Sequence, residues 1–126
     1  MKSLLILLCL SFTFISSWSM AAEVVLSKSQ FIDYMKTALP NAFCAEKQYF
    51  RKCFKVTEDV CLSEAMRATK VCILSMEGEM PEKFHQPKDG ADWGTKMGTC
   101  AGTNYEVSLT KSKIDSADCK DPSKWK

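Results

Sequence analysis

Residues 41–76 read NAFCAEKQYFRKCFKVTEDVCLSEAMRATKVCILSM and carry the main evidence for the fold class. Asn41 and Thr57 belong to the residue types that cap helix N-termini, and two carboxylates follow Thr57, where negative charge suits the helix dipole. The pattern predicts one helix over residues 41–54 and another over residues 57–76. Helices joined by so short a turn are expected to form an antiparallel hairpin.

Another helix is expected before this stretch. Ser27 and Gln30 have the spacing of a capping box, in which each side chain bonds to the backbone amide of the other residue. Apolar side chains then repeat at helical spacing along one face, at Phe31, Tyr34, Met35, Ala38 and Leu39. Pro40 is expected to end this helix, because proline lacks the amide hydrogen that the next turn needs.

The C-terminal half begins with an expected loop over residues 81–90. Glycine then recurs at every fourth position, at Gly90, Gly94, Gly98 and Gly102. We favour a helix over residues 91–110, on which these glycines would let the backbone of a neighbouring element approach. Alternation of apolar and polar residues from Tyr105 to Leu109 keeps a short strand near the C-terminus open as an alternative. The tail over residues 113–126 is expected to be irregular and pinned by Cys119.

Residues 1–22 have the three parts of a secretory signal peptide. Lys2 precedes an apolar run, and small residues follow at the positions that a signal peptidase reads. The run is shorter than the roughly 20 apolar residues of a spanning helix, so no stable membrane anchor is expected after cleavage. Residues 23–126 are then expected to form a single domain, secreted or periplasmic.

Six of the seven cysteines lie beyond the signal peptide, at Cys44, Cys53, Cys61, Cys72, Cys100 and Cys119. An even number in an exported chain is typical of a disulfide framework. A zinc site would need closely spaced cysteine pairs or several histidines, so no metal and no cofactor are expected.

The predicted hairpin limits how the cysteines can pair. Cys44 and Cys53 lie too far apart along one helix to bond to each other, and so do Cys61 and Cys72. The hairpin would place Cys53 opposite Cys61 and Cys44 opposite Cys72, which leaves Cys100 for Cys119. Nine residues turn Cys44 away from Cys53 on a straight helix, so a bond from Cys44 to Cys100 or Cys119 remains an alternative.

Composition excludes some function classes and names none. The chain has 17 lysines and arginines against 15 aspartates and glutamates, a formal net charge of +2, and no basic cluster, so no nucleic-acid partner is expected. His85 is the sole histidine. No group of reactive residues defines a catalytic site, and no motif assigns the chain to a family.

The segment over residues 84–93 is the best candidate for recognition. It combines aromatic, histidine and carboxylate side chains in an expected loop, and loops commonly carry binding residues. The candidate residues are Phe84, His85, Asp89, Asp92 and Trp93. The alternative is that Phe84 and Trp93 are core residues. We therefore expect a small exported binding module, non-catalytic and of inhibitor or immunity type, with a protein partner. A carrier of an apolar ligand, and a secreted hydrolase or toxin using His85 and nearby carboxylates, are the alternatives.

Overall fold

The computed structural model describes residues 22–125, so the expected signal peptide lies outside the described residues except for Ala22. This part of the chain contains four α-helices, α1 (Lys28–Cys44), α2 (Tyr49–Lys52), α3 (Glu58–Met76) and α4 (Lys88–Ser108). Two strands, β1 (Val25–Ser27) and β2 (Lys83–His85), and three short 3-10 helices, η1 (Glu77–Glu79), η2 (Thr110–Ser112) and η3 (Pro122–Lys124), complete it. The expected class, a small and mainly helical fold held by disulfides, is confirmed.

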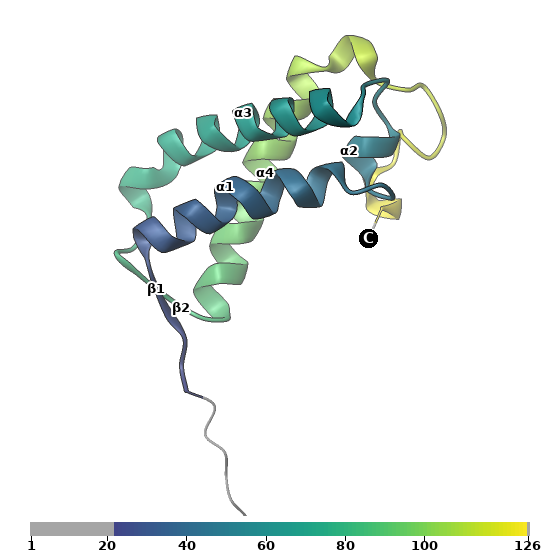
Figure 1. Cartoon of the computed structure of the whole chain (residues 1–126). Helices are drawn as coiled ribbons and strands as arrows, with labels where there is room; N and C mark the ends of the chain where they lie inside the picture. The colour runs from purple at the N-terminus through teal and green to yellow at the C-terminus, as the bar shows by residue number, and fades with distance from the viewer. Residues whose placement is uncertain (1–21, 126) are drawn as a thin grey trace, which may run out of the picture.

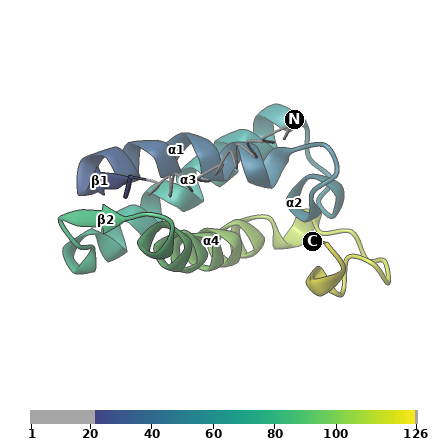
Figure 2. The ribbon, with the colours of Figure 1, turned by 90° about the horizontal axis from the view of Figure 1, so that it is seen from below.

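Helices α1 and α3 lie side by side and antiparallel, and α4 crosses behind them (Figure 1). Seen from below, the β1–β2 pair lies at one end of the molecule, while α2 and the C-terminal tail lie at the other (Figure 2). The two strands are antiparallel, and Leu26 is opposite Phe84. Within residues 22–125, no helix combines the length and the apolar character needed to cross a membrane.

Helix α1 begins as its sequence predicts but continues beyond the predicted end. The Gln30 amide donates to Ser27 Oγ at 3.2 Å, and the Ser27 amide donates to Gln30 Oε1 at 2.9 Å, which confirms the capping box. Pro40 does not end the helix, which runs on to Cys44. The cost of the missing hydrogen bond is offset because Pro40 and Cys44 are both buried against the rest of the molecule.

The apolar face of α1 differs from the predicted face at Ile32, which is buried, and at Tyr34, which is exposed. Phe31, Ile32 and Met35 are buried, whereas Tyr34 is 63% exposed. Helical spacing alone could not tell which edge of the stripe would be covered, because the neighbouring helix determines its orientation.

The prediction of a helix over residues 41–54 is wrong. Its first residues belong to α1, the backbone becomes extended at Ala45, and only the single turn of α2 follows. The hairpin therefore consists of α1 and α3. Helix α3 itself begins where Thr57 predicts, because Thr57 Oγ1 accepts a hydrogen bond from the Val60 amide at 3.4 Å.

Helix α4 confirms the favoured interpretation of the C-terminal half, although it begins earlier, at Lys88, within the expected loop. Its glycines do not admit a neighbouring backbone. A Cβ atom at Gly102 would lie 3.0 Å from Cζ of the Phe50 ring, and one at Gly98 would lie 3.8 Å from Leu39 Cδ1, whereas Gly94 has nothing within 4 Å. Side chains from α1 and α2 therefore occupy the space that Gly98 and Gly102 leave.

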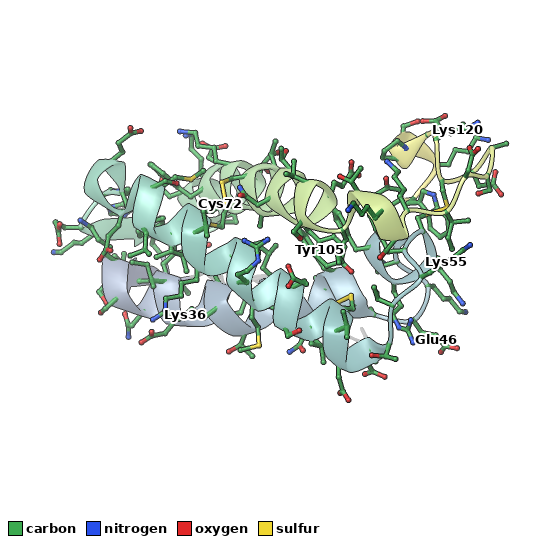
Figure 3. The ribbon with its side chains drawn as sticks, turned by 90° about the horizontal axis from the view of Figure 1, so that it is seen from above. Lys36, Glu46, Lys55, Cys72, Tyr105 and Lys120 are labelled. Atoms are coloured by element: carbon green, nitrogen blue, oxygen red, sulfur yellow. A yellow bond between two sulfur atoms is a disulfide. The ribbon has the colours of Figure 1, made fainter. Side chains whose placement is uncertain are left out.

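The six cysteines are paired as expected, but the predicted connectivity is wrong. The bridges are Cys44–Cys61, Cys53–Cys119 and Cys72–Cys100. Because α1 rather than residues 41–54 packs against α3, the end of α1 brings Cys44 to the first turn of α3. Figure 3 shows the Cys72 bridge joining α3 to α4.

The C-terminal tail is tied to α2 by backbone and disulfide. The Ile114 amide donates to the Cys53 carbonyl at 2.8 Å, and Phe54 pairs with Lys113 in an isolated antiparallel bridge. Together with the Cys53–Cys119 disulfide, these bonds hold the tail beside the short helix.

Candidate functional site

Phe84 is a core residue of the β1–β2 end. Its side chain is fully buried and stacks on Phe31, with ring centroids 4.1 Å apart and an interplanar angle of 11°. It lies on β2 with its side chain turned between α1 and α4, so it cannot contact a partner without unfolding. The structure therefore places Phe84 in the alternative role that the sequence left open.

Trp93 packs against this core but stays partly open. Its ring meets Phe84 edge to face, with centroids 6.4 Å apart, and the Lys96 ammonium lies 4.3 Å from the Trp93 ring centroid. A cation over an indole face is an attractive electrostatic contact. Trp93 is half-buried, so part of the ring can meet a ligand.

His85 lies on the surface with a carboxylate beside it. Its Nδ1 is 2.9 Å from Glu23 Oε1, and its backbone amide donates to Asp89 Oδ2 at 2.8 Å. A catalytic histidine needs a nucleophile or a substrate proton within hydrogen-bonding reach. Among the residues that the structure describes, no serine or threonine hydroxyl hydrogen-bonds to the ring, and every cysteine is in a disulfide.

Asp89 and Asp92 have local partners on the first turns of α4. Asp89 accepts from the His85 amide, which links the helix to β2, and Asp92 accepts from Lys88 Nζ at 2.9 Å, one turn away. The Asp92 carboxylate holds the pKa of Lys88 above its usual value. Phe84 is thus buried and Trp93 is half-buried, while the other three candidate residues make separate local contacts. The five residues do not converge on one site.

Trp93 nevertheless lines a hollow that the sequence did not predict. A shallow, mainly apolar groove of about 610 Å³ runs along α4 beside the end of α3. Its lining residues are Met76, Glu79, Trp93, Thr95, Lys96, Thr99, Cys100, Thr103 and Asn104. We call this the Trp93 groove. The one sequence feature that indicates this surface is threonine at every fourth position, at Thr95, Thr99 and Thr103, because residues with this spacing lie on the same face of a helix.

The Trp93 groove has a rigid floor. The Cys72–Cys100 disulfide joins the two helices beneath it, and Asn104 Nδ2 donates to the Cys100 carbonyl at 3.1 Å. Glu79 and Lys96 add one negative and one positive charge to the described lining. Such a surface suits an apolar side chain flanked by polar contacts.

Within residues 22–125, no three histidine, cysteine, aspartate or glutamate side chains are grouped so that they could hold a metal ion.

Comparison with protein families gives one result. A family model described as "T2SS substrate NttA" matches residues 25–113, which is most of the chain. The match covers α1 to α4 and the Trp93 groove, and it ends where the tail begins. Neither the curated proteins nor the solved structures contain a significant match.

Proposed function

Because the chain belongs to the NttA family of type II secretion system substrates, we propose that it is a non-catalytic binding module that acts on a protein partner after export. Export from the cytoplasm follows from the family, and three disulfides suit an oxidising compartment. The binding of a protein partner is the proposed part of this function.

The Trp93 groove is the observation that supports a protein partner. Aromatic anchors in rigid, partly desolvated pockets commonly supply most of the binding energy at protein interfaces. Trp93 is such an anchor, and the Cys72–Cys100 bridge fixes its surroundings before binding, which lowers the entropy lost on association. Of the other candidate residues, His85 and Asp92 are exposed and lie outside the groove lining.

The proposal is tested by filling the groove without touching the core. Thr99 is exposed and lines the groove, so Thr99→Arg places a long side chain in it. Thr37 is exposed on α1 and lies outside the groove lining, so Thr37→Arg is the matched control. Both variants are compared with the native oxidised protein, immobilised and exposed to extracellular and periplasmic fractions of the source.

We expect one stoichiometric protein to be retained by the native protein and by Thr37→Arg. Thr99→Arg should weaken this binding by roughly 30-fold or more, as expected for the loss of a central contact. Equal retention by Thr99→Arg would exclude the groove as the binding surface. A lipid found in the purified protein, with no protein retained, would favour the carrier instead.

A further inference from the structure

A second hollow lies at the opposite end of α4. It has a volume of about 350 Å³ and is bounded by the last turn of α1, by α2, by α4 and by the C-terminal tail. Its principal lining residues are Phe43, Tyr49, Phe50, Glu106 and Trp125. We call it the Glu106 pocket. Glu106 lies thirteen positions after Trp93 on α4, which is about 20 Å along the helix, so the two sites are distinct.

Aromatic rings form the walls of the Glu106 pocket. Phe43 and Phe50 stack with centroids 4.1 Å apart, and Tyr49 meets Phe50 edge to face at 5.0 Å. Trp125 meets Tyr49 at 6.2 Å with an interplanar angle of 63°. Phe43, Phe50 and Trp125 are only partly buried, so their ring surfaces remain accessible from the pocket.

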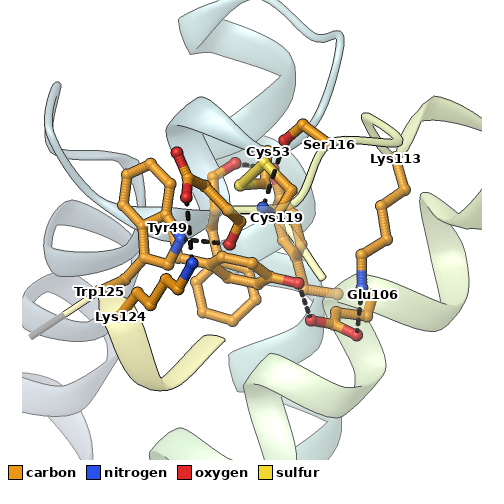
Figure 4. Close-up of a disulfide and its surroundings, with 11 residues drawn as sticks. Tyr49, Cys53, Glu106, Lys113, Ser116, Cys119, Lys124 and Trp125 are labelled. Carbon is orange, nitrogen blue, oxygen red and sulfur yellow. Dashed lines mark hydrogen bonds and ion pairs between the residues drawn. A yellow bond between two sulfur atoms is a disulfide. The ribbon is translucent and has the colours of Figure 1, made fainter. Parts of the chain in front are cut away.

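A carboxylate, that of Glu106, contributes to the lining of the pocket. Tyr49 donates its hydroxyl hydrogen to Glu106 Oε1 at 2.6 Å (Figure 4). Burial, followed by the Glu106 hydrogen bond, raises the pKa of Tyr49, so the phenol is a neutral donor at physiological pH. Among the described residues that line the pocket, Glu106 alone is charged, which disfavours anions there.

The ammonium group of Lys113, which does not line the pocket, already contacts Glu106 and Tyr49. Lys113 Nζ lies 3.4 Å from Glu106 Oε2 and 5.7 Å from the Tyr49 ring centroid. Neither side chain of this ion pair is deeply buried, and the separation is long for a salt bridge. The carboxylate therefore keeps part of its attraction for a second cation.

The Cys53–Cys119 disulfide helps to position the wall that Trp125 forms. The bridge holds the tail beside α2, and Trp125 Nε1 donates to the Asp118 carbonyl at 3.1 Å, which orients the indole (Figure 4). An aromatic wall fixed by a disulfide and a hydrogen bond forms a pocket before any ligand arrives.

From these contacts we propose that the Glu106 pocket binds the trimethylammonium group of a choline-type compound. Aromatic faces attract cations, and methylated ammonium ions suit them best because they are apolar at the surface and weakly hydrated. A small metal cation would have to give up its water to rings that cannot replace it. The pocket volume of about 350 Å³ is sufficient for the methylated group.

The test is a titration of the oxidised full chain with choline, followed by the NMR signals of the Trp125 indole and the Glu106 amide. We expect saturable shifts at both positions. The control ligand is the neutral carbon isostere of choline, in which a tert-butyl group replaces the trimethylammonium group. It should bind roughly tenfold more weakly. Absence of saturable shifts with choline, or equal binding of the two ligands, would overturn the proposal.

Variants separate charge from shape. Glu106→Gln keeps an acceptor for the Tyr49 hydroxyl but removes the charge, and should weaken choline binding about tenfold. Glu77→Gln, at an exposed position outside the lining of both hollows, should leave binding unchanged. Lys113→Met removes the competing ammonium and should strengthen binding. Undiminished binding by Glu106→Gln, in a variant with native thermal stability, would refute the role of the carboxylate.

The same protein also distinguishes two sources of the ligand. Sedimentation with vesicles of phosphatidylcholine, but not with vesicles of phosphatidylethanolamine, would assign a lipid headgroup. Choline binding without vesicle binding would assign a soluble choline compound. Trp125→Phe retains a ring and should retain binding, whereas Trp125→Ala should lose it; binding that survives Trp125→Ala would contradict the proposed wall.

Discussion

Tyr49 Oη donates a 2.6 Å hydrogen bond to Glu106 Oε1, and this contact joins residues 57 positions apart in the sequence. It links the single turn of α2 to the last turns of α4, in a region where the backbone of residues 45–48 is irregular. The bond is partly buried, so water competes with it only in part. A stability change is therefore expected when either partner is removed.

Replacing Tyr49 with phenylalanine should lower the free energy of unfolding by about 1–2 kcal/mol, because the lost hydrogen bond is to a charged acceptor. Urea unfolding of the oxidised protein measures the change. Tyr34→Phe is the matched control, since Tyr34 is 63% exposed, and it should change stability by less than about 0.5 kcal/mol. Equal effects of the two substitutions would show that the Tyr49–Glu106 bond does not contribute to stability.

Two glycines of α4 should respond oppositely to alanine. A Cβ atom added at Gly94 would have nothing within 4 Å, so Gly94→Ala should stabilise the helix by about 1 kcal/mol. At Gly102 the added Cβ would lie 3.0 Å from the Phe50 ring, so Gly102→Ala should gain nothing or destabilise. Thermal unfolding of both variants measures the difference, and a stabilised Gly102→Ala would mean that the ring moves aside freely.

The Cys53–Cys119 bridge should contribute more to stability than the Cys44–Cys61 bridge. The bonded residues are 66 and 17 positions apart, and the chain-entropy model gives about 4 and about 3 kcal/mol. Paired Cys→Ser substitutions, each compared with the native protein by urea unfolding, test the order. Peptide mapping without reduction tests the connectivity, and a Cys53–Cys61 peptide would contradict this structure.

Alkaline pH should destabilise the fold through Tyr105. Burial raises the pKa of Tyr105 from 10.0 to about 12, because the charged phenolate cannot be hydrated there. The folded pKa is above the unfolded one, so this contribution is complete below about pH 10 and is lost as the pH rises towards about 12. Tyr105→Phe should flatten the stability profile over that interval. An unchanged slope in the variant would assign the alkaline loss to other groups.

Local signals in the sequence predicted the N-terminal ends of α1 and α3, the helices that begin with a side-chain cap. Ser27 with Gln30, and Thr57, mark helix starts that the structure confirms, because a cap is satisfied by atoms within a few residues. The helical interpretation of residues 91–110 also holds for most of its length. The Trp93 groove was missed because its lining comes from two helices whose relative position no local pattern gives.

The wrong hairpin and the wrong disulfide connectivity share one cause. Pro40 predicted a helix end, and the buried contacts of Pro40 and Cys44 overrode that local preference. Once α1 extends to Cys44, the hairpin partner changes, and with it the predicted disulfides. The β1–β2 pair was missed for a related reason: three-residue strands separated by α1 and α3 have too little local pattern to be recognised.

The sequence by itself determined the helical class and the helix starts marked by Ser27 and Thr57, since these depend on residues close together in the chain. It also determined the even number of cysteines beyond the predicted signal peptide. Only the tertiary structure decided which cysteines bond, which face of α1 is buried and which aromatic side chains surround Glu106. These depend on how helices pack, and packing is a property of pairs of surfaces distant in sequence. A disulfide such as Cys53–Cys119 depends on that packing, because its two sulfur atoms can bond only after the folded chain has brought them together.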